Sequence, residues 1–175
     1  MRSHAAEGWD CPFCRIARGE EEEGPWTKRS DVIYRDADLV AFLSPHFWQR
    51  NPGHVLIIPN RHYENLYDMP DDLLGKVAVL SRQVALAMKR AYGCDGTSVR
   101  QHNEPAGNQD VWHYHLHVFP RHAGDDLYRS SVNAHQTGRT PALRRSITGR
   151  ARSSRPGLAV NEAAHVVCGD SMWRR

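Results

Sequence analysis

The sequence predicts an α+β fold built around a mostly antiparallel sheet. Short segments typical of strands cluster before and after a single long amphipathic helix, which is the arrangement expected of this class. The chain of 175 residues is long enough for one domain with a hydrophobic core plus an appendage, and too short for us to expect two full domains.

The first part of the chain predicts a short helix and three strands. One or two helical turns are expected over residues 11–17. The segments that predict strands are Val32–Arg35, Leu39–Leu43 and Val55–Ile58. Residues 36–38 join the first two as a hairpin turn, and the third is apolar throughout, which is typical of a central strand. Residues 44–51 are expected to form an aromatic loop.

Residues 71–92 predict the long helix. Apolar residues recur along one face at steps of three and four: Leu73, Val77, Leu80, Val84, Met88 and Ala91. An acidic pair suits the first turn, and Gly93 suits the position just past the end. A strand over residues 97–102, a loop over residues 103–110 and a histidine-rich strand complete the domain.

The net charge of +3 is unevenly distributed. Residues 129–175 contain nine arginines, no lysine and two acidic residues, a charge of +7, which leaves −4 for residues 1–128. We therefore expect an N-terminal extension at residues 1–9, a domain at residues 10–128 and a loosely ordered, arginine-rich C-terminal tail at residues 129–175. Because the basic pI belongs to the tail, nucleic-acid binding is not expected of the domain.

The chain has no apolar run long enough to span a membrane, and its first residues lack the apolar stretch of a secretory signal. We expect a cytoplasmic protein without a membrane partner. In such a protein, the four cysteines indicate metal or redox chemistry at a close pair and not a disulfide framework.

Residues 112–121 read WHYHLHVFPR and place three histidines at alternate positions. In a strand, His113, His115 and His117 share one face, and the apolar residues between them face the core. A polar face open to water is the alternative, because antiparallel sheets often have one wet side. Exposure to solvent does not select histidine over other polar residues at all three positions, whereas catalysis and metal binding do. The pattern therefore favours a functional cluster.

Cys11 and Cys14 are separated by two residues. Such a pair fits a redox dithiol, half of a zinc site or a chance spacing. A structural zinc ion needs four ligands, and His62 and His113 are candidates for the other two, although spacing alone does not select them.

The loop at residues 103–110 reads NEPAGNQD and leads directly into the histidines. Its glycine and flanking amides can offer N–H groups to an anion. An ordinary polar turn has the same composition. The adjacent histidines favour the anion-binding interpretation.

Taken together, these motifs resemble the histidine triad (HIT) family of nucleotide hydrolases and transferases. HYHLHVF matches the hallmark of the family, in which three histidines alternate with apolar residues and two more apolar residues follow. NPGHVLIIPNRH at residues 51–62 and the loop at residues 103–109 stand at family-like spacings, and CPFC at residues 11–14 resembles the zinc-binding bacterial branch. The resemblance covers residues 10–121.

The resemblance implies a HIT-like two-layer fold with a five-stranded, mostly antiparallel sheet, one long helix and a short N-terminal helix. Members are usually homodimers that bind a purine nucleotide and cleave at its α-phosphorus. The strand at residues 56–58 and the long helix could lie at the dimer interface or belong to the monomer core.

Matched by position, the resemblance implies a role for each site residue. His115 would be the nucleophile that forms a transient nucleotidyl-histidine, His117 would assist at the phosphate, and the carbonyl of His113 would orient the His115 imidazole. The implied substrate-binding residues are Asn103, Gly107, Asn108, Gln109, Asp110 and Ser44. The implied zinc ligands are Cys11, Cys14, His62 and His113. Four protein ligands make that ion structural, so the chemistry itself needs no cofactor.

Two positions depart from the family pattern. Asp110 stands where many members have serine, and a carboxylate donates no proton to a leaving amine unless it is protonated. Ser44 stands where an acid or amide often holds the ribose hydroxyls, in a loop longer than usual. We expect a hydrolase of nucleoside 5′-phosphoramidates, adenylylated compounds or dinucleoside polyphosphates. The alternative is a non-catalytic nucleotide-binding or scaffold protein of the same fold.

Overall fold

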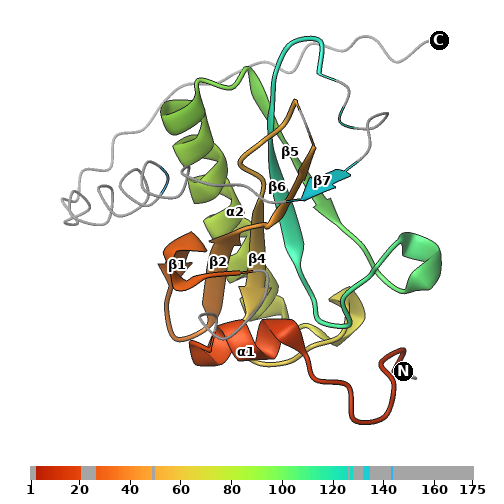
Figure 1. The fold of residues 1–175 in the computed structure, drawn as a ribbon. Helices are drawn as coiled ribbons and strands as arrows, with labels where there is room; N and C mark the ends of the chain where they lie inside the picture. Colours follow the sequence, from red (N-terminus) through yellow and green to blue (C-terminus); the bar gives the residue numbers. More distant parts are fainter. Residues whose placement is uncertain are drawn as a thin grey trace, which may run out of the picture.

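A computed structural model describes residues 3–20, 27–48, 50–125, 127, 132–134 and 143 of the chain. Its centre is a five-stranded antiparallel sheet with the strand order β1-β2-β4-β6-β5. The strands are β1 (Val32–Arg35), β2 (Leu39–Leu43), β4 (Val55–Pro59), β5 (Gly96–Gln101) and β6 (Leu116–Arg121). The predicted fold class is therefore confirmed, with β4 as the central strand (Figure 1).

The long helix α2 (Asp71–Tyr92) has the predicted bounds. Pro70 is its N-cap, and Gly93 ends it with a φ of 63°, a left-handed conformation that glycine adopts without a Cβ penalty. The short helix α1 (Pro12–Arg18) begins one residue later than predicted, because Cys11 is its N-cap and accepts a hydrogen bond from the N–H of Cys14 at 3.4 Å. Short 3₁₀ helices in the described part of the chain join these elements: Arg29–Asp31, Leu66–Asp68 and Pro105–Gly107.

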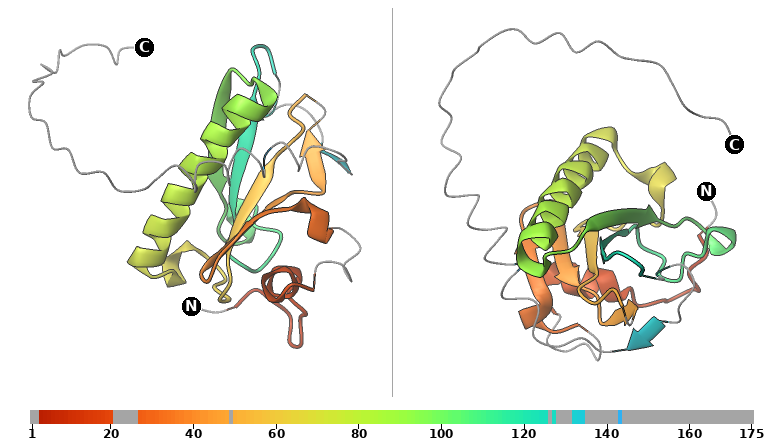
Figure 2. Two further views of the ribbon diagram at one scale, coloured as in Figure 1. Left: turned by 90° about the vertical axis from the view of Figure 1, so that its left-hand side faces the viewer. Right: turned by 90° about the horizontal axis from the view of Figure 1, so that it is seen from above.

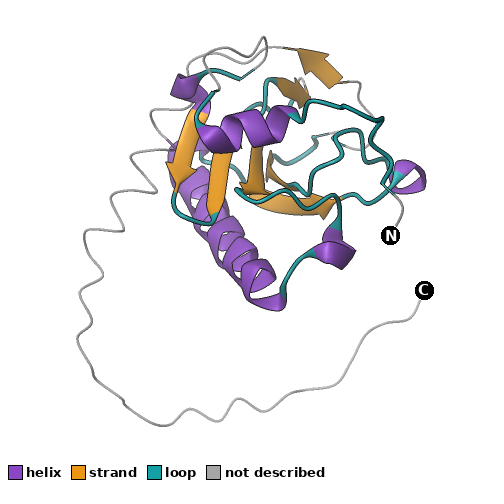
Figure 3. Ribbon diagram, turned by 90° about the horizontal axis from the view of Figure 1, so that it is seen from below, coloured by secondary structure: helices purple, strands orange, loops and turns teal. Residues whose placement is uncertain are grey.

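The sheet is covered on both faces (Figures 2 and 3). On one face, alternate residues of the strands pack against the apolar stripe of α2, and this cluster includes Ile57, Val77, Val84 and Val118. On the other face, Val40, Phe42, Leu56 and Ile58 pack against Phe13 and Ile16 of α1. Because successive side chains of a strand point to opposite faces, a strand buried on both sides is apolar throughout, as β4 is. Residues 56–58 thus belong to the monomer core.

The structure changes two of the predicted elements. Residues 44–51 are not wholly a loop, because His46–Trp48 form the short strand β3. This strand pairs with β7 (Val132–Ala134), which is distant in sequence and therefore gives no local signal. The histidine-rich segment becomes a regular strand only at Leu116, after His113 and His115.

Most of the tail predicted at residues 129–175 lies outside the described residues, apart from β7 and Leu143. The described residues contain no helix that is both long enough and apolar enough to cross a membrane.

Candidate active site

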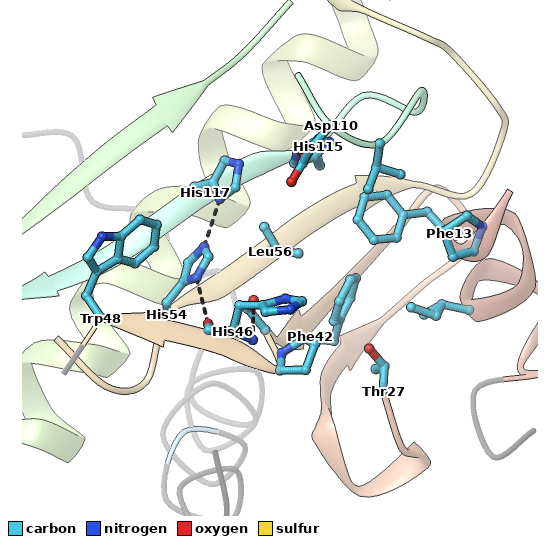
Figure 4. Close-up of a pocket in the computed structure, with 15 residues that line it drawn as sticks. Phe13, Thr27, Phe42, His46, Trp48, His54, Leu56, Asp110, His115 and His117 are labelled. Carbon is cyan, nitrogen blue, oxygen red and sulfur yellow. Dashed lines mark hydrogen bonds and ion pairs between the residues drawn. The ribbon is translucent and has the colours of Figure 1, made fainter. Parts of the chain in front are cut away.

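The pairing of β4 with β6 brings the candidate catalytic histidines together. Leu56 lies opposite His117 in this ladder, so His54, two residues earlier in the chain, reaches the same region of the sheet. The rings of His54 and His117 are stacked with their centres 5.0 Å apart, and the rings of His115 and His117 meet edge to face at 4.8 Å. Residues more than 60 positions apart in sequence therefore form one imidazole cluster (Figure 4).

His115 is held in a single tautomer. Its Nδ1 lies 2.7 Å from the backbone carbonyl oxygen of His113, and a carbonyl only accepts, so Nδ1 carries the proton. Nε2 then has a free lone pair. Burial lowers the pKa of His115 below its usual value, despite the hydrogen bond to His113 and the negative charge of Asp110, which both raise it. The imidazole is therefore neutral at neutral pH, which is the state a nucleophile requires.

His54 and His117 form a hydrogen-bonded pair. His54 Nδ1 is 3.4 Å from the carbonyl oxygen of His46, and His54 Nε2 is 2.8 Å from Nδ1 of His117. Complete burial lowers the pKa of His54 to about 3, and desolvation together with the charge of His54 lowers that of His117 well below its usual value. Because His54 Nδ1 donates to a carbonyl, its Nε2 accepts the proton of His117 Nδ1.

A pocket of about 430 Å³ opens in front of these rings (Figure 4). Its apolar lining includes Phe13 and Ile16 from α1, Phe42 from β2, Leu56 from β4 and Trp48 from β3. The polar residues in the lining are Thr27, Ser44, His46, His54, Asp110, His115 and His117. A largely apolar cavity with a few convergent polar groups is typical of a small-molecule site.

The structure separates the predicted substrate-binding residues into two groups. Ser44 and Asp110 line the pocket, and Oδ1 of Asp110 lies 3.8 Å from Nε2 of His115. Asn103, Gly107, Asn108 and Gln109 are not among the lining residues.

The second group builds the loop that carries Asp110. Gln109 donates to the carbonyl of Val111 at 3.1 Å and accepts from the N–H of Glu104 at 2.8 Å. Asn103 accepts from the N–H of Leu66 at 2.8 Å. Asn108 has a φ of 65°, a left-handed conformation that asparagine tolerates better than most residues.

The four predicted metal ligands also come together. The potential ligand atoms of Cys11, Cys14, His62 and His113 all lie within 4.8 Å of one another. Nδ1 of His113 is 3.3 Å and 3.5 Å from the two thiols, and Nδ1 of His62 is 3.2 Å from Cys14 Sγ. A tetrahedral zinc ion with usual bond lengths places its sulfur and nitrogen ligands about 3.6 Å apart, close to these values.

The surroundings of this cluster also fit a metal. His113 Nε2 donates to the carbonyl of Pro59 at 3.0 Å, which leaves Nδ1 as the ligand atom facing the thiols. The N–H of Tyr114 donates to the carbonyl of Tyr63 at 2.6 Å, and this bond holds the neighbouring His62 beside His113. Burial raises the pKa of the Cys11 thiol to about 12, so a thiolate there requires a compensating cation.

Comparison of the sequence with known proteins identifies the family of this chain. The family model of the HIT domain matches residues 27–124. The chain belongs to the HIT family. An uncharacterized HIT-like protein of Methanocaldococcus jannaschii is 35% identical over 115 residues, which cover 66% of this chain and 81% of that protein. A relative with a named activity, an adenylylsulfatase of Arabidopsis thaliana, is 31% identical over 121 residues, or 69% of this chain and 57% of that protein.

Solved structures of HIT proteins share the fold. The crystal structure of a zinc-bound histidine triad family protein from Mycobacterium smegmatis matches with a TM-score of 0.68 and 28% identity over 83% of this chain and 98% of that chain.

Sequence reasoning missed part of this HIT pocket. Five lining residues carry no functional signal of their own in the motifs: Phe13, Phe42, His46, Trp48 and His54. The signal that could have found His54 is its position directly before the buried strand β4, which pairs with the strand that carries His117. His46 and Trp48 gave no such signal, since their place depends on the pairing of β3 with β7.

Proposed function

We propose that this HIT protein is a nucleotide hydrolase that uses His115 as its nucleophile. The observation that carries the proposal is the hydrogen bond from His115 Nδ1 to the carbonyl of His113, which leaves Nε2 unprotonated in the pocket. Nε2 attacks the α-phosphorus, the bond from phosphorus to the leaving group breaks, and a leaving amine takes up a proton from solvent as it departs. Water then displaces the histidine and releases a nucleoside monophosphate, so that one difficult displacement becomes two easier ones.

His117 is the group we assign to the phosphate. In the free protein it is neutral, but a bound phosphate brings negative charge next to its ring and raises its pKa. A proton on His117 Nε2 then donates to a phosphate oxygen, while Nδ1 keeps its bond to His54. This donor is fixed by its contacts before the substrate arrives, and preorganised donors are usually the largest contribution to such catalysis.

The nucleoside occupies the apolar part of the pocket in this proposal. Phe13 and Phe42 meet edge to face with their ring centres 5.7 Å apart and offer aromatic surface to a purine base. Ser44, with Thr27 and His46, supplies the polar edge for the ribose. The loop at residues 103–110 places Asp110 and the backbone N–H groups of the loop beside the phosphate. The residues that shape this loop are Asn103, Gly107, Asn108 and Gln109.

We further propose that Cys11, Cys14, His62 and His113 bind a structural zinc ion. Bound there, zinc would lock α1 and the start of the histidine segment to β4, and with four protein ligands it leaves no position for substrate. We propose the same division of the chain as before: residues 1–9, a catalytic domain at 10–128 and a tail at 129–175. The HIT match falls inside the central part.

A homodimer is also part of the proposal. β5 is an edge of the sheet, and it carries Val99 with 51% of its surface exposed. An edge strand presents unpaired N–H and C=O groups, so a second β5 pairing there would extend the sheet across two copies.

The experiment that tests the enzyme is a comparison of wild type with His115→Ala. Both are incubated with an adenosine 5′-phosphoramidate and with a diadenosine polyphosphate, and AMP release is followed. We expect AMP from the wild type alone, with an unchanged circular dichroism spectrum for the variant. Bound nucleotide without AMP from the wild type would instead support a non-catalytic nucleotide-binding protein.

A further inference from the structure

The lining of the pocket carries a negative charge, although the proposed substrate contains an anionic phosphate. Among the described residues, no lysine or arginine lines it, and Asp110 is its one carboxylate. The guanidinium of Arg100 on β5 lies over the ring of Phe119, 5.5 Å from the ring centre, and outside the lining. His102, whose ring centre is 5.5 Å from that of His117, also stands outside it.

The buried pair of His54 and His117 does not offset this carboxylate in the free protein. His54 and His117 are 2.8 Å apart, so two protonated rings would repel each other strongly in a buried site. The pKa of each is depressed by burial, in agreement with the contact. Among the described lining residues, Asp110 is therefore the fixed charge, and the guanidinium of Arg100 acts on His54 and His117 from outside the lining.

Asp110 also occupies a specific place relative to the reaction. Its Oδ1 lies 3.8 Å from Nε2 of His115, and Figure 4 shows the two residues beside each other. His115 is buried, whereas the Asp110 side chain is 86% exposed. In an in-line displacement the leaving group departs opposite to the nucleophile, so it points from the buried His115 toward solvent, past Asp110.

We propose that Asp110 selects the leaving group by its charge, favouring neutral or cationic amines over anionic groups such as polyphosphate or sulfate. This inference rests on the proposed function and narrows its substrate class. The α-phosphate itself brings one negative charge, which His117 offsets once it is protonated in the complex. Each further negative charge on the leaving group meets the carboxylate, and each positive charge is attracted to it.

The exposure of the Asp110 side chain sets the size of its effect on the rate, because an exposed charge acts through a water-like dielectric. For a charge about 6 Å away in a water-like dielectric, Coulomb's law gives about a threefold change in rate per unit charge. A leaving group that ends in an ammonium and one that ends in a carboxylate differ by two charges, so their rates should differ by about tenfold at low ionic strength.

The test uses adenosine 5′-phosphoramidates of three amines of equal length: butylamine, 1,3-diaminopropane and β-alanine. All three break the same phosphorus–nitrogen bond and differ only in the charge at the far end. The kcat/KM for AMP release is measured for wild type, Asp110→Asn and Asp68→Asn. Asp68 is an exposed carboxylate outside the pocket, and its variant controls for the loss of a surface charge.

We expect the wild type and Asp68→Asn to prefer the diaminopropane over the β-alanine compound by about tenfold, with the preference shrinking as salt is added. Asp110→Asn should bring the ratio close to one. An equal loss for all three substrates in Asp110→Asn, or an unchanged ratio, would overturn the inference and leave the hydrolase standing. No AMP from any substrate in the wild type would refute the proposed function itself.

Discussion

Replacing Gly53 with alanine should destabilise the protein, although the change adds only a methyl group. Gly53 has a φ of 99°, a conformation that residues with a Cβ rarely adopt. A Cβ built there would lie 2.5 Å from Cε2 and 2.8 Å from Cζ of Tyr92, so the ring at the end of α2 would have to move. Backbone strain of about 1–3 kcal/mol together with the displaced ring suggests a loss of about 2–4 kcal/mol.

Gly75 provides the matched control. It lies inside α2, and nothing stands within 4 Å of a Cβ added there. Gly75→Ala should therefore stabilise the protein by about 0.5–1 kcal/mol, because alanine loses less entropy in a helix. Thermal unfolding followed by circular dichroism should show the Tm of Gly53→Ala falling by about 8–15 °C and that of Gly75→Ala rising by a few degrees. An unchanged Tm for Gly53→Ala, or a lower one for Gly75→Ala, would refute the reasoning.

Three further predictions concern pH, metal and assembly. Because the folded pKa of His54 is about 3 and the unfolded value is about 6.5, the unfolded chain binds more protons between these values, and stability should fall as pH decreases from about 6.5 toward 3. Urea unfolding should show that the free energy of unfolding changes less between pH 7 and pH 5 in His54→Asn than in the wild type. An equal change in both proteins would contradict the low pKa of His54. Cys14→Ser should lose one zinc per chain by elemental analysis and unfold at a lower temperature, whereas Cys94→Ala should keep its zinc; full zinc content in both would count against the site. Val99→Lys should convert a dimer to a monomer in light scattering, because an exposed charge on an edge strand opposes sheet extension; a dimer that persists would place the interface elsewhere.

The sequence alone was sufficient for the elements that depend on local periodicity. The bounds of α2 follow from one apolar stripe and its end signals, and β1 and β2 follow from short apolar runs around a turn. Such patterns are readable because each residue's burial is fixed by the helix or strand that contains it. The resemblance of the motifs added the family, and the match over residues 27–124 confirms it.

The tertiary structure decided which groups meet, because those contacts join residues far apart in the chain. Spacing left open which histidines accompany Cys11 and Cys14, and it is the packing of α1 on the sheet and the bond from Tyr114 to Tyr63 that bring His62 and His113 to them. The pairing of β4 with β6 likewise places His54 against His117. The distance of 3.8 Å from Asp110 to His115 depends on a loop held by hydrogen bonds to Glu64 and Leu66, which are far away in the chain, and no local pattern in the sequence encodes it.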